Sequence, residues 1–121
     1  MSHGSSCHVE LPTPDLEKSR SFYEGSFGWT FRIVPGMETY AMFTTSNGFG
    51  GGFDAGPNAE PPSEAGPILH IEVDDIDAAL TKIADAGGAT VIGKTEISDE
   101  FGYYAIFLDN VGNRLGLWSQ G

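Results

Sequence analysis

The spacing of apolar residues changes from a strand period to a helical period within the first 28 residues of the chain. Alternation over Cys7–Leu11 predicts a strand, in which odd-numbered and even-numbered side chains lie on opposite faces. A helical stripe of apolar residues begins after Asp15, a favourable N-cap, and ends at Gly28, a favourable residue just beyond a helix. This stretch therefore predicts one strand followed by one amphipathic helix.

The same stretch occurs twice in the chain. When Asp15 is aligned with Asp75, residues 8–28 and residues 68–88 run in step without a gap. Internal repetition of this kind indicates that the fold is built from copies of one unit. Two copies are too few for a solenoid, so we expect a pseudo-symmetric pair of modules.

Each predicted helix is followed by three further strand-like runs, so each module reads strand, helix, strand, strand, strand. The glycine run 50–52 indicates a bulge, a close backbone approach, or a sheet face without side chains. Residues 94–102 are polar and are expected to form a loop. The fold class is therefore α+β, with two βαβββ modules whose sheets each lay one face on a helix. The later strands are predicted at Trp29–Val34, Thr39–Thr45, Phe49–Phe53, Thr90–Ile92, Tyr103–Leu108 and Arg114–Trp118.

Between the two copies lies a segment rich in proline, glycine and alanine that shows no periodicity, which is typical of a linker. We expect a first module over residues 7–54, a linker over residues 55–66 and a second module over residues 67–119. At 121 residues, the modules together are expected to form one domain.

The formal net charge is −11 and the isoelectric point is about 4.3. Nucleic acids and anionic membrane surfaces require a basic patch, so neither is an expected partner. An acidic surface suits a cationic ligand, or solubility alone. Cys7 is the only cysteine, which excludes an intrachain disulfide and suits a reducing cytoplasm. No apolar run approaches the ~18 residues of a membrane span, and nothing resembles a signal peptide.

Three motifs together resemble one family. They are DLEKSRSFYEGSFG at 15–28, VDDIDAALTKIADAGG at 73–88 and DNVGNRLGLW at 109–118. In this order they resemble the vicinal oxygen chelate superfamily, which includes glyoxalase I, bleomycin-resistance proteins, extradiol dioxygenases and fosfomycin-resistance enzymes. The resemblance covers residues 7–119. It implies two βαβββ modules whose curved sheets enclose a cavity, and it implies a homodimer, with modules paired within or between chains.

The resemblance also implies four metal-coordinating positions, on the first and last strand of each module. In this sequence they fall on His8, Ile68, Gly52 and Gly116. Isoleucine and glycine offer no donor side chain, whereas protein metal sites need at least three protein ligands. We therefore expect no cofactor, with a divalent metal as the disfavoured alternative.

Glu10 and His70 align with each other in the repeat, and the implied fold brings the two opening strands close together. A carboxylate beside an imidazole favours general acid–base catalysis, and equally an ion pair that orients a ligand. A displaced metal site made of His8, Glu10, His70 and Glu72 is a further alternative. It breaks the repeat by two residues, because Glu72 aligns with Pro12.

Aromatic and polar residues on the same strands are candidates for a ligand pocket. A cationic or planar aromatic ligand suits them through cation–π contact, although ordinary sheet packing accounts for at least half of such aromatics. Arg114 could meet a ligand carboxylate or pair with one of 17 acidic residues. The ligand-binding candidates are His8, Glu72, Tyr40, Met42, Tyr104, Arg114 and Trp118.

The sequence therefore predicts a glyoxalase/bleomycin-resistance-like protein that binds a small organic ligand in the inter-module cavity without the family's metal. The alternative is a glyoxalase-like lyase or isomerase, or a dioxygenase-like enzyme, with a displaced metal site or with Glu10/His70 acid–base chemistry. A third interpretation is an interaction module with a vestigial cavity. No Ser-His-Asp order, phosphate-binding loop or dinucleotide fingerprint is present.

Overall fold

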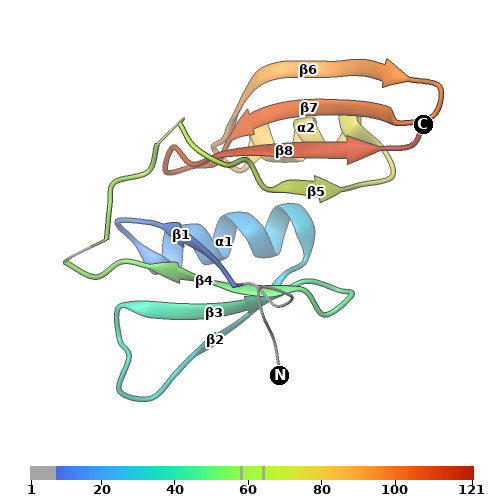
Figure 1. Ribbon diagram of the computed structural model, residues 1–121. Helices are drawn as coiled ribbons and strands as arrows, with labels where there is room; N and C mark the ends of the chain where they lie inside the picture. Colours follow the sequence, from blue (N-terminus) through green and yellow to red (C-terminus); the bar gives the residue numbers. More distant parts are fainter. Residues whose placement is uncertain (1–7, 58, 64) are drawn as a thin grey trace. The chain divides into compact units, whose positions relative to one another are not determined.

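The computed structural model describes residues 8–57, 59–63 and 65–121, so Cys7 lies outside the described residues. The chain divides into two compact units, Met1–Pro61 and Pro62–Gly121. In its described residues, each unit has one helix and one four-stranded mixed sheet (Figure 1). The α+β fold with two βαβββ modules, predicted from the repeat, is confirmed. Among the described residues, no helix combines the length and the hydropathy that crossing a membrane requires.

The first unit runs β1 (Val9–Pro12), α1 (Leu16–Phe27), β2 (Thr30–Ile33), β3 (Tyr40–Thr44) and β4 (Gly50–Asp54). Its sheet has the strand order β1-β4-β3-β2. The outer strand β1 is parallel to β4, and the other neighbours are antiparallel.

The second unit runs β5 (His70–Glu72), α2 (Ile76–Asp85), β6 (Ala89–Ser98), β7 (Gly102–Leu108) and β8 (Arg114–Ser119). Its strand order, β5-β8-β7-β6, is that of the first unit, and again only the opening strand pairs in parallel. The sequence repeat thus corresponds to a repeat of topology.

A ladder of aromatic rings forms the core of the first unit, on the sheet face covered by α1. Tyr23 of α1 stacks on Trp29 with ring centroids 4.6 Å apart, and Trp29 stacks on Phe43 at 4.4 Å. Phe22 and Phe53 complete this buried layer, and all five side chains are at most 4% exposed. Aromatic pairs at such distances add attraction to the burial of their apolar area.

The core of the second unit is mainly aliphatic. Ile76 and Ile83 of α2 are fully buried, as are Phe107, Leu115 and Leu117 of the sheet. Leu117 pairs with Ile71, and Leu115 with Phe107, so these side chains share the face that α2 covers. Each module therefore buries one face of its sheet with its own helix.

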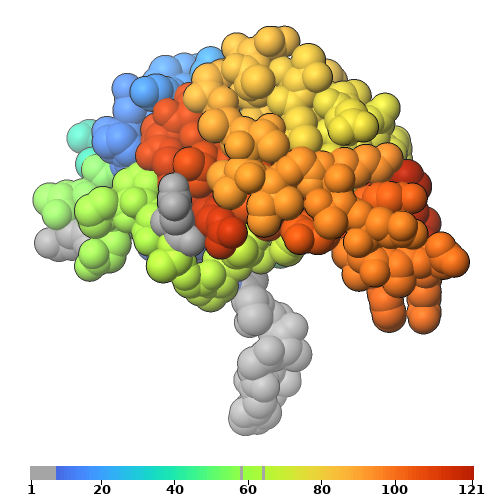
Figure 2. Space-filling view, turned by 90° about the horizontal axis from the view of Figure 1, so that it is seen from above, coloured from blue at the N-terminus to red at the C-terminus, as the bar shows by residue number. Residues whose placement is uncertain are grey.

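The strand predicted at Thr90–Ile92 is present, but the polar loop predicted over residues 94–102 was wrong for most of its length. The structure has one ten-residue strand, β6, where a short strand and a polar loop were expected. Its pairing with β7 is shifted at three places, between Thr90 and Ile92, between Ile92 and Thr95, and between Glu96 and Ser98. Such shifts disrupt the two-residue alternation that identifies a strand in a sequence. β6 is also an edge strand, and in Figure 2 its orange segment lies exposed on the surface.

Close backbone approach, one of the three predicted explanations, accounts for Gly50 and Gly51 of the glycine run in β4. A Cβ on Gly51 would overlap the carbonyl oxygen and side chain of Val9 and the ring of Phe43. A Cβ on Gly50 would lie 3.1 Å from the carbonyl oxygen of Phe43. The pairing of β4 with β3 is continuous, so the run contains no bulge. Glycine is needed here because the space of a side chain is already filled.

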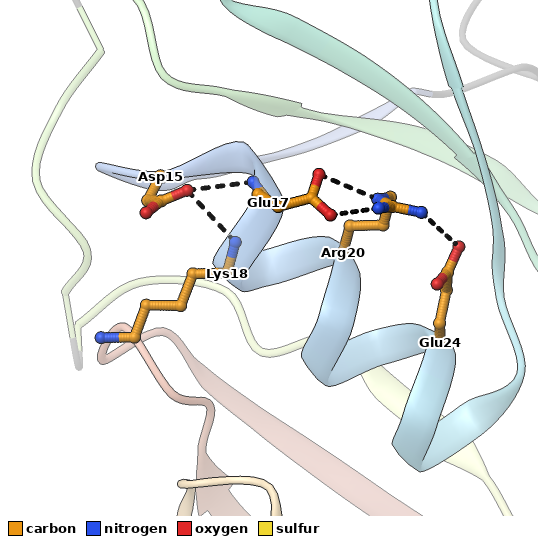
Figure 3. A network of polar contacts seen from close by, with 5 residues as sticks. All are labelled: Asp15, Glu17, Lys18, Arg20 and Glu24. Atoms are coloured by element: carbon orange, nitrogen blue, oxygen red, sulfur yellow. Dashed lines mark hydrogen bonds and ion pairs between the residues drawn. The ribbon is translucent and has the colours of Figure 1, made fainter.

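Both helices begin at the predicted caps. The Asp15 carboxylate accepts hydrogen bonds from the backbone N–H groups of Glu17 (3.0 Å) and Lys18 (3.2 Å), as Figure 3 shows. The equivalent Asp75 accepts one from the N–H of Ala78 at 3.0 Å. These bonds satisfy donors that have no partner within the first helical turn.

Left-handed glycines follow both helices, but not at aligned positions. Gly28 has a φ of 69°, whereas in the second unit the left-handed residue is Gly87, with a φ of 99°. The repeat alignment pairs Gly28 with Gly88. The left-handed residue that follows the second helix therefore lies one position earlier than the alignment suggests.

We expect D15A to lower the free energy of unfolding by about 1 kcal/mol, because two helix N–H groups lose their acceptor. Urea unfolding followed by circular dichroism measures this loss. The control is R20A, which removes ion pairs to Glu17 and Glu24 on the exposed surface of the same helix (Figure 3). Exposed ion pairs stabilise little, so R20A should cost less than D15A. A larger loss for R20A would contradict this account.

We expect G51A to destabilise the protein by roughly 2 kcal/mol or more, since backbone atoms of β1 cannot move away from the added methyl group. Thermal and urea unfolding test this expectation. The matched control is G25A in α1, where an added Cβ meets nothing within 4 Å. Alanine is favoured over glycine inside a helix, so G25A should be neutral or stabilising. Equal losses in the two variants would show that backbone contact is not the cause.

Candidate functional site

Predicted site residues of the first unit lie on the sheet face opposite α1. Glu10 pairs with Gly52 across β1 and β4, and Gly52 pairs with Met42 across β4 and β3. Residues paired in this way have their side chains on the same face, so Glu10 and Met42 share a face. Tyr40 lies two residues before Met42 on the same strand and therefore shares it as well.

Three of the predicted residues, His8, Glu10 and Tyr40, interact in the first unit. The imidazole Nε2 of His8 lies 2.6 Å from the phenol oxygen of Tyr40. His8 directly precedes β1, and Tyr40 opens β3. Burial, then a hydrogen bond to the Glu10 carboxylate, and then the charges of Glu10 and Asp54 raise the pKa of Tyr40 to about 12. The phenol is therefore neutral at any physiological pH.

The ring of Tyr40 occupies the place of a side chain at position 52. A Cβ built on Gly52 would overlap the Oη, Cζ and Cε1 atoms of Tyr40. Gly52 is also buried. The glycine therefore leaves room for the phenol to lie against the strand beside Glu10.

In the second unit, predicted site residues also share the face opposite the helix. Glu72 pairs with Trp118 across β5 and β8, and Trp118 pairs with Tyr104 across β8 and β7. His70 precedes Glu72 by two residues, and Arg114 precedes Trp118 by four, so strand alternation places both on this face. The Trp118 indole N–H donates to the carbonyl oxygen of Phe101 at 2.6 Å.

Gly116 accommodates a ring as Gly52 does. A Cβ on Gly116 would overlap the Nδ1 and Cε1 atoms of the His70 imidazole. His70 pairs with Gly116, just as Glu10 pairs with Gly52. Glu10 and His70 thus hold equivalent positions in the two units, as the repeat alignment predicts. They belong to different units, so their acid–base pair stays a prediction.

Two charged residues of the first unit were missed by sequence reasoning. Arg32 pairs with Met42, and Asp54 pairs with Tyr40, so both lie on the candidate face. Strand parity would have found Arg32, because it alternates with Phe31 and Ile33. Asp54 lies just beyond the strand predicted at Phe49–Phe53, whereas it is the last residue of β4.

Comparison with known sequences gives one family match. A sequence profile of the family described as bleomycin resistance protein-like N-terminal matches residues 6–46. "Putative glyoxylase CFP32" of Mycobacterium tuberculosis is 32% identical over 114 residues, which cover 91% of this chain and 43% of that protein. The anthracycline biosynthesis protein DnrV of Streptomyces peucetius is 26% identical, over 98% of this chain and 48% of its own length. The chain therefore spans less than half the length of these curated relatives.

Solved structures share the fold across nearly the whole chain. A glyoxalase/bleomycin resistance protein/dioxygenase family enzyme from Burkholderia phytofirmans has a TM-score of 0.75 at 19% identity and covers 94% of this chain and 97% of its own. A variant of the fosfomycin resistance protein FosX from Listeria monocytogenes, complexed with Mn(II) and a dihydroxypropylphosphonic acid, has a TM-score of 0.76 at 15% identity. It covers 99% of this chain and 93% of its own.

In sequence the first module is similar to bleomycin-resistance-like proteins, and in fold the chain is similar to glyoxalase/bleomycin resistance/dioxygenase proteins.

The four metal-coordinating positions that the superfamily implies do not fit a divalent ion in this chain. Ile68, Gly52 and Gly116 carry no donor atom in their side chains. At both glycines the space in which a ligating side chain would start is filled by a ring, Tyr40 in one unit and His70 in the other. Among the described residues, no three His, Cys, Asp or Glu side chains form a group that could hold a metal. Metal-free binding stays a prediction.

The raised pKa of Tyr40 predicts a stability change at high pH. An unfolded tyrosine titrates near 10 and the folded Tyr40 near 12, so between these values the folded state holds the extra proton. The contribution of the Tyr40 proton to the free energy of unfolding is therefore full below about pH 10, and it is lost as the pH rises through 12. We expect wild-type protein to lose more unfolding free energy than Y40F between pH 9 and pH 12. Urea unfolding at stepped pH measures this, and parallel curves for the two proteins would contradict it.

Proposed function

We propose that this chain is a member of the superfamily and binds a small organic ligand on the sheet faces opposite α1 and α2, without the metal of its metal-dependent relatives. The observation that carries the proposal is the sorting of side chains between the two faces. In both units the helix side is apolar and buried, while the opposite side combines aromatic and hydrogen-bonding groups. Faces of this composition suit small-molecule binding, since apolar area supplies affinity and a few polar groups fix orientation. The residues concerned are Glu10, Tyr40, Met42, His70, Glu72, Tyr104, Arg114 and Trp118, with His8 beside Tyr40.

Charge and relatives both support an organic ligand. The net charge of −11 favours cationic compounds. A profile of bleomycin-resistance-like proteins matches the first module, and DnrV is named for anthracycline biosynthesis. Because the chain spans under half of DnrV and CFP32, their activities serve here only to choose test compounds.

A second candidate is a glyoxalase-like lyase or isomerase, or a dioxygenase-like enzyme. The equivalent positions of Glu10 and His70 favour it, because a carboxylate and an imidazole at matched sites are suited to proton transfer. The displaced metal set of His8, Glu10, His70 and Glu72 belongs to this alternative. For either function we propose a homodimer working in the cytoplasm.

We expect purified protein to contain less than stoichiometric zinc, nickel or manganese, as measured by elemental analysis. Thermal-shift screening should then identify a stabilising compound among bleomycin, an anthracycline, a glutathione thioester and a 2-hydroxy acid. Binding raises the melting temperature by mass action, so compounds are compared at equal concentration. Stoichiometric metal that disappears in H8A or H70A would contradict metal-free binding. No shift with any compound would contradict ligand binding altogether.

The enzyme alternative is tested with the hemithioacetal of methylglyoxal and glutathione. Turnover that E10Q and H70A both abolish would establish the Glu10/His70 pair as catalytic. Absence of turnover, together with a thermal shift, is the result that our first proposal expects. The matched control is E96Q, which removes one carboxylate from the exposed strand β6.

A further inference from the structure

The rings of His8 and Tyr40 are joined end to end. Their planes differ by 21° and their centroids are 6.4 Å apart. That separation is about the sum of the two ring radii, the phenol C–O bond and the 2.6 Å contact between Nε2 and the phenol oxygen. Rings stacked face to face lie closer together than this, as the 4.4 Å between Trp29 and Phe43 illustrates. The imidazole and the phenol therefore form one nearly flat surface, which we call the His8–Tyr40 platform.

The platform is held in place from two directions. Beneath it lies Gly52, whose missing side chain leaves the space that the phenol fills. At its edge the phenol interacts with both His8 and Glu10. A ring fixed in this way loses little conformational freedom when a ligand binds, which favours affinity.

The charges near the platform are mostly negative. Glu10 is exposed and Asp54 is half-buried, and both act on the Tyr40 phenol. Arg32 lies in the same row across the sheet, Glu10–Gly52–Met42–Arg32. Three strand spacings, about 14 Å, separate its Cα from that of Glu10. A positively charged group on a bound molecule is thus favoured at the Glu10 end.

We propose that the His8–Tyr40 platform positions the ligand and that the ligand class is a flat aromatic cation, its ring lying on the platform and its charged group beside Glu10. This inference rests on the proposed function and narrows it to one unit and one chemistry. Aromatic stacking and cation–π attraction act together on such a ligand. Tyr40 serves as the residue that sets specificity, and Gly52 positions Tyr40 without touching the ligand.

Fluorescence titration with 9-aminoacridine tests the proposal, because this compound is flat and carries one positive charge at pH 7. The comparison compound is acridine-9-carboxylate, which has the same ring system and a negative charge. We expect saturable 1:1 binding of the cation and at least tenfold weaker binding of the anion. Y40A, E10Q and G52A should each weaken binding of the cation about tenfold, and Y40F should weaken it less.

Three control variants separate the platform from general effects. E96Q removes the same charge as E10Q from an exposed strand, and Y103F changes a tyrosine of β7 that pairs with Glu96. G93A adds a methyl group in open space, whereas G52A adds one where the phenol lies. All three controls should bind 9-aminoacridine as the wild type does. Thermal unfolding checks that G52A is folded, and Y40F keeps the test valid if it is not.

Two results would overturn the inference. The first is no saturable binding of 9-aminoacridine, or equal binding of both compounds. The second is binding that Y40A, E10Q and G52A leave unchanged. In either case the proposed function stands if another compound of the thermal-shift screen binds, and it fails only if none does.

Discussion

Packing of one helix against one face of each sheet is the contact on which the rest of the structure depends. The aromatic ladder from Tyr23 through Trp29 to Phe43 fixes α1 on its sheet. Buried Ile76 and Ile83 do the same for α2. Since side chains alternate along a strand, the choice of helix face decides which residues reach the opposite face. Strand alternation alone then puts the charged and hydrogen-bonding groups of the strands on that opposite face.

Glycine has a specific part in shaping those faces. Gly52 and Gly116 hold equivalent positions, and each leaves room for a ring from another strand. Tyr40 fills one space and His70 the other, so a phenol and an imidazole lie where side chains at positions 52 and 116 would begin. Substituting a donor at either glycine would first have to displace a ring. Glycine at positions 52 and 116 is therefore required by the packing of these two rings.

Much of the fold was predictable because it is periodic and repeated. The caps at Asp15 and Asp75 and the alternation around them fix element type and order, and the repeat confirms each half with the other. The ten-residue strand β6 was not predictable, because three register shifts hide its alternation. Two-residue alternation along β3 puts Tyr40 and Met42 on one strand face. It could not show that Tyr40 leans over Gly52, since that depends on the register of β3 with β4 and on the direction of the Tyr40 side chain.

The pairing of Glu10 with His70 is a different kind of prediction. Each residue lies where the repeat places it, in parallel register with a glycine of its own unit. Their equivalence is a property of sequence and topology, whereas their meeting depends on how modules assemble. Equivalent positions are thus necessary for the acid–base pair and do not by themselves create it.

Metal-free ligand binding on the face that carries Tyr40 is the central claim, and Met42 reports on it directly. The chain has three methionines, so selective 13C labelling of their methyl groups gives a simple NMR spectrum. Met42 lies on the candidate face, while Met37 lies in the turn before β3 and is 46% exposed. In protein treated with EDTA, a binding compound should shift the Met42 methyl signal and leave that of Met37 unchanged. A Met42 signal that stays fixed, or that moves only after zinc or manganese is added, would contradict the account.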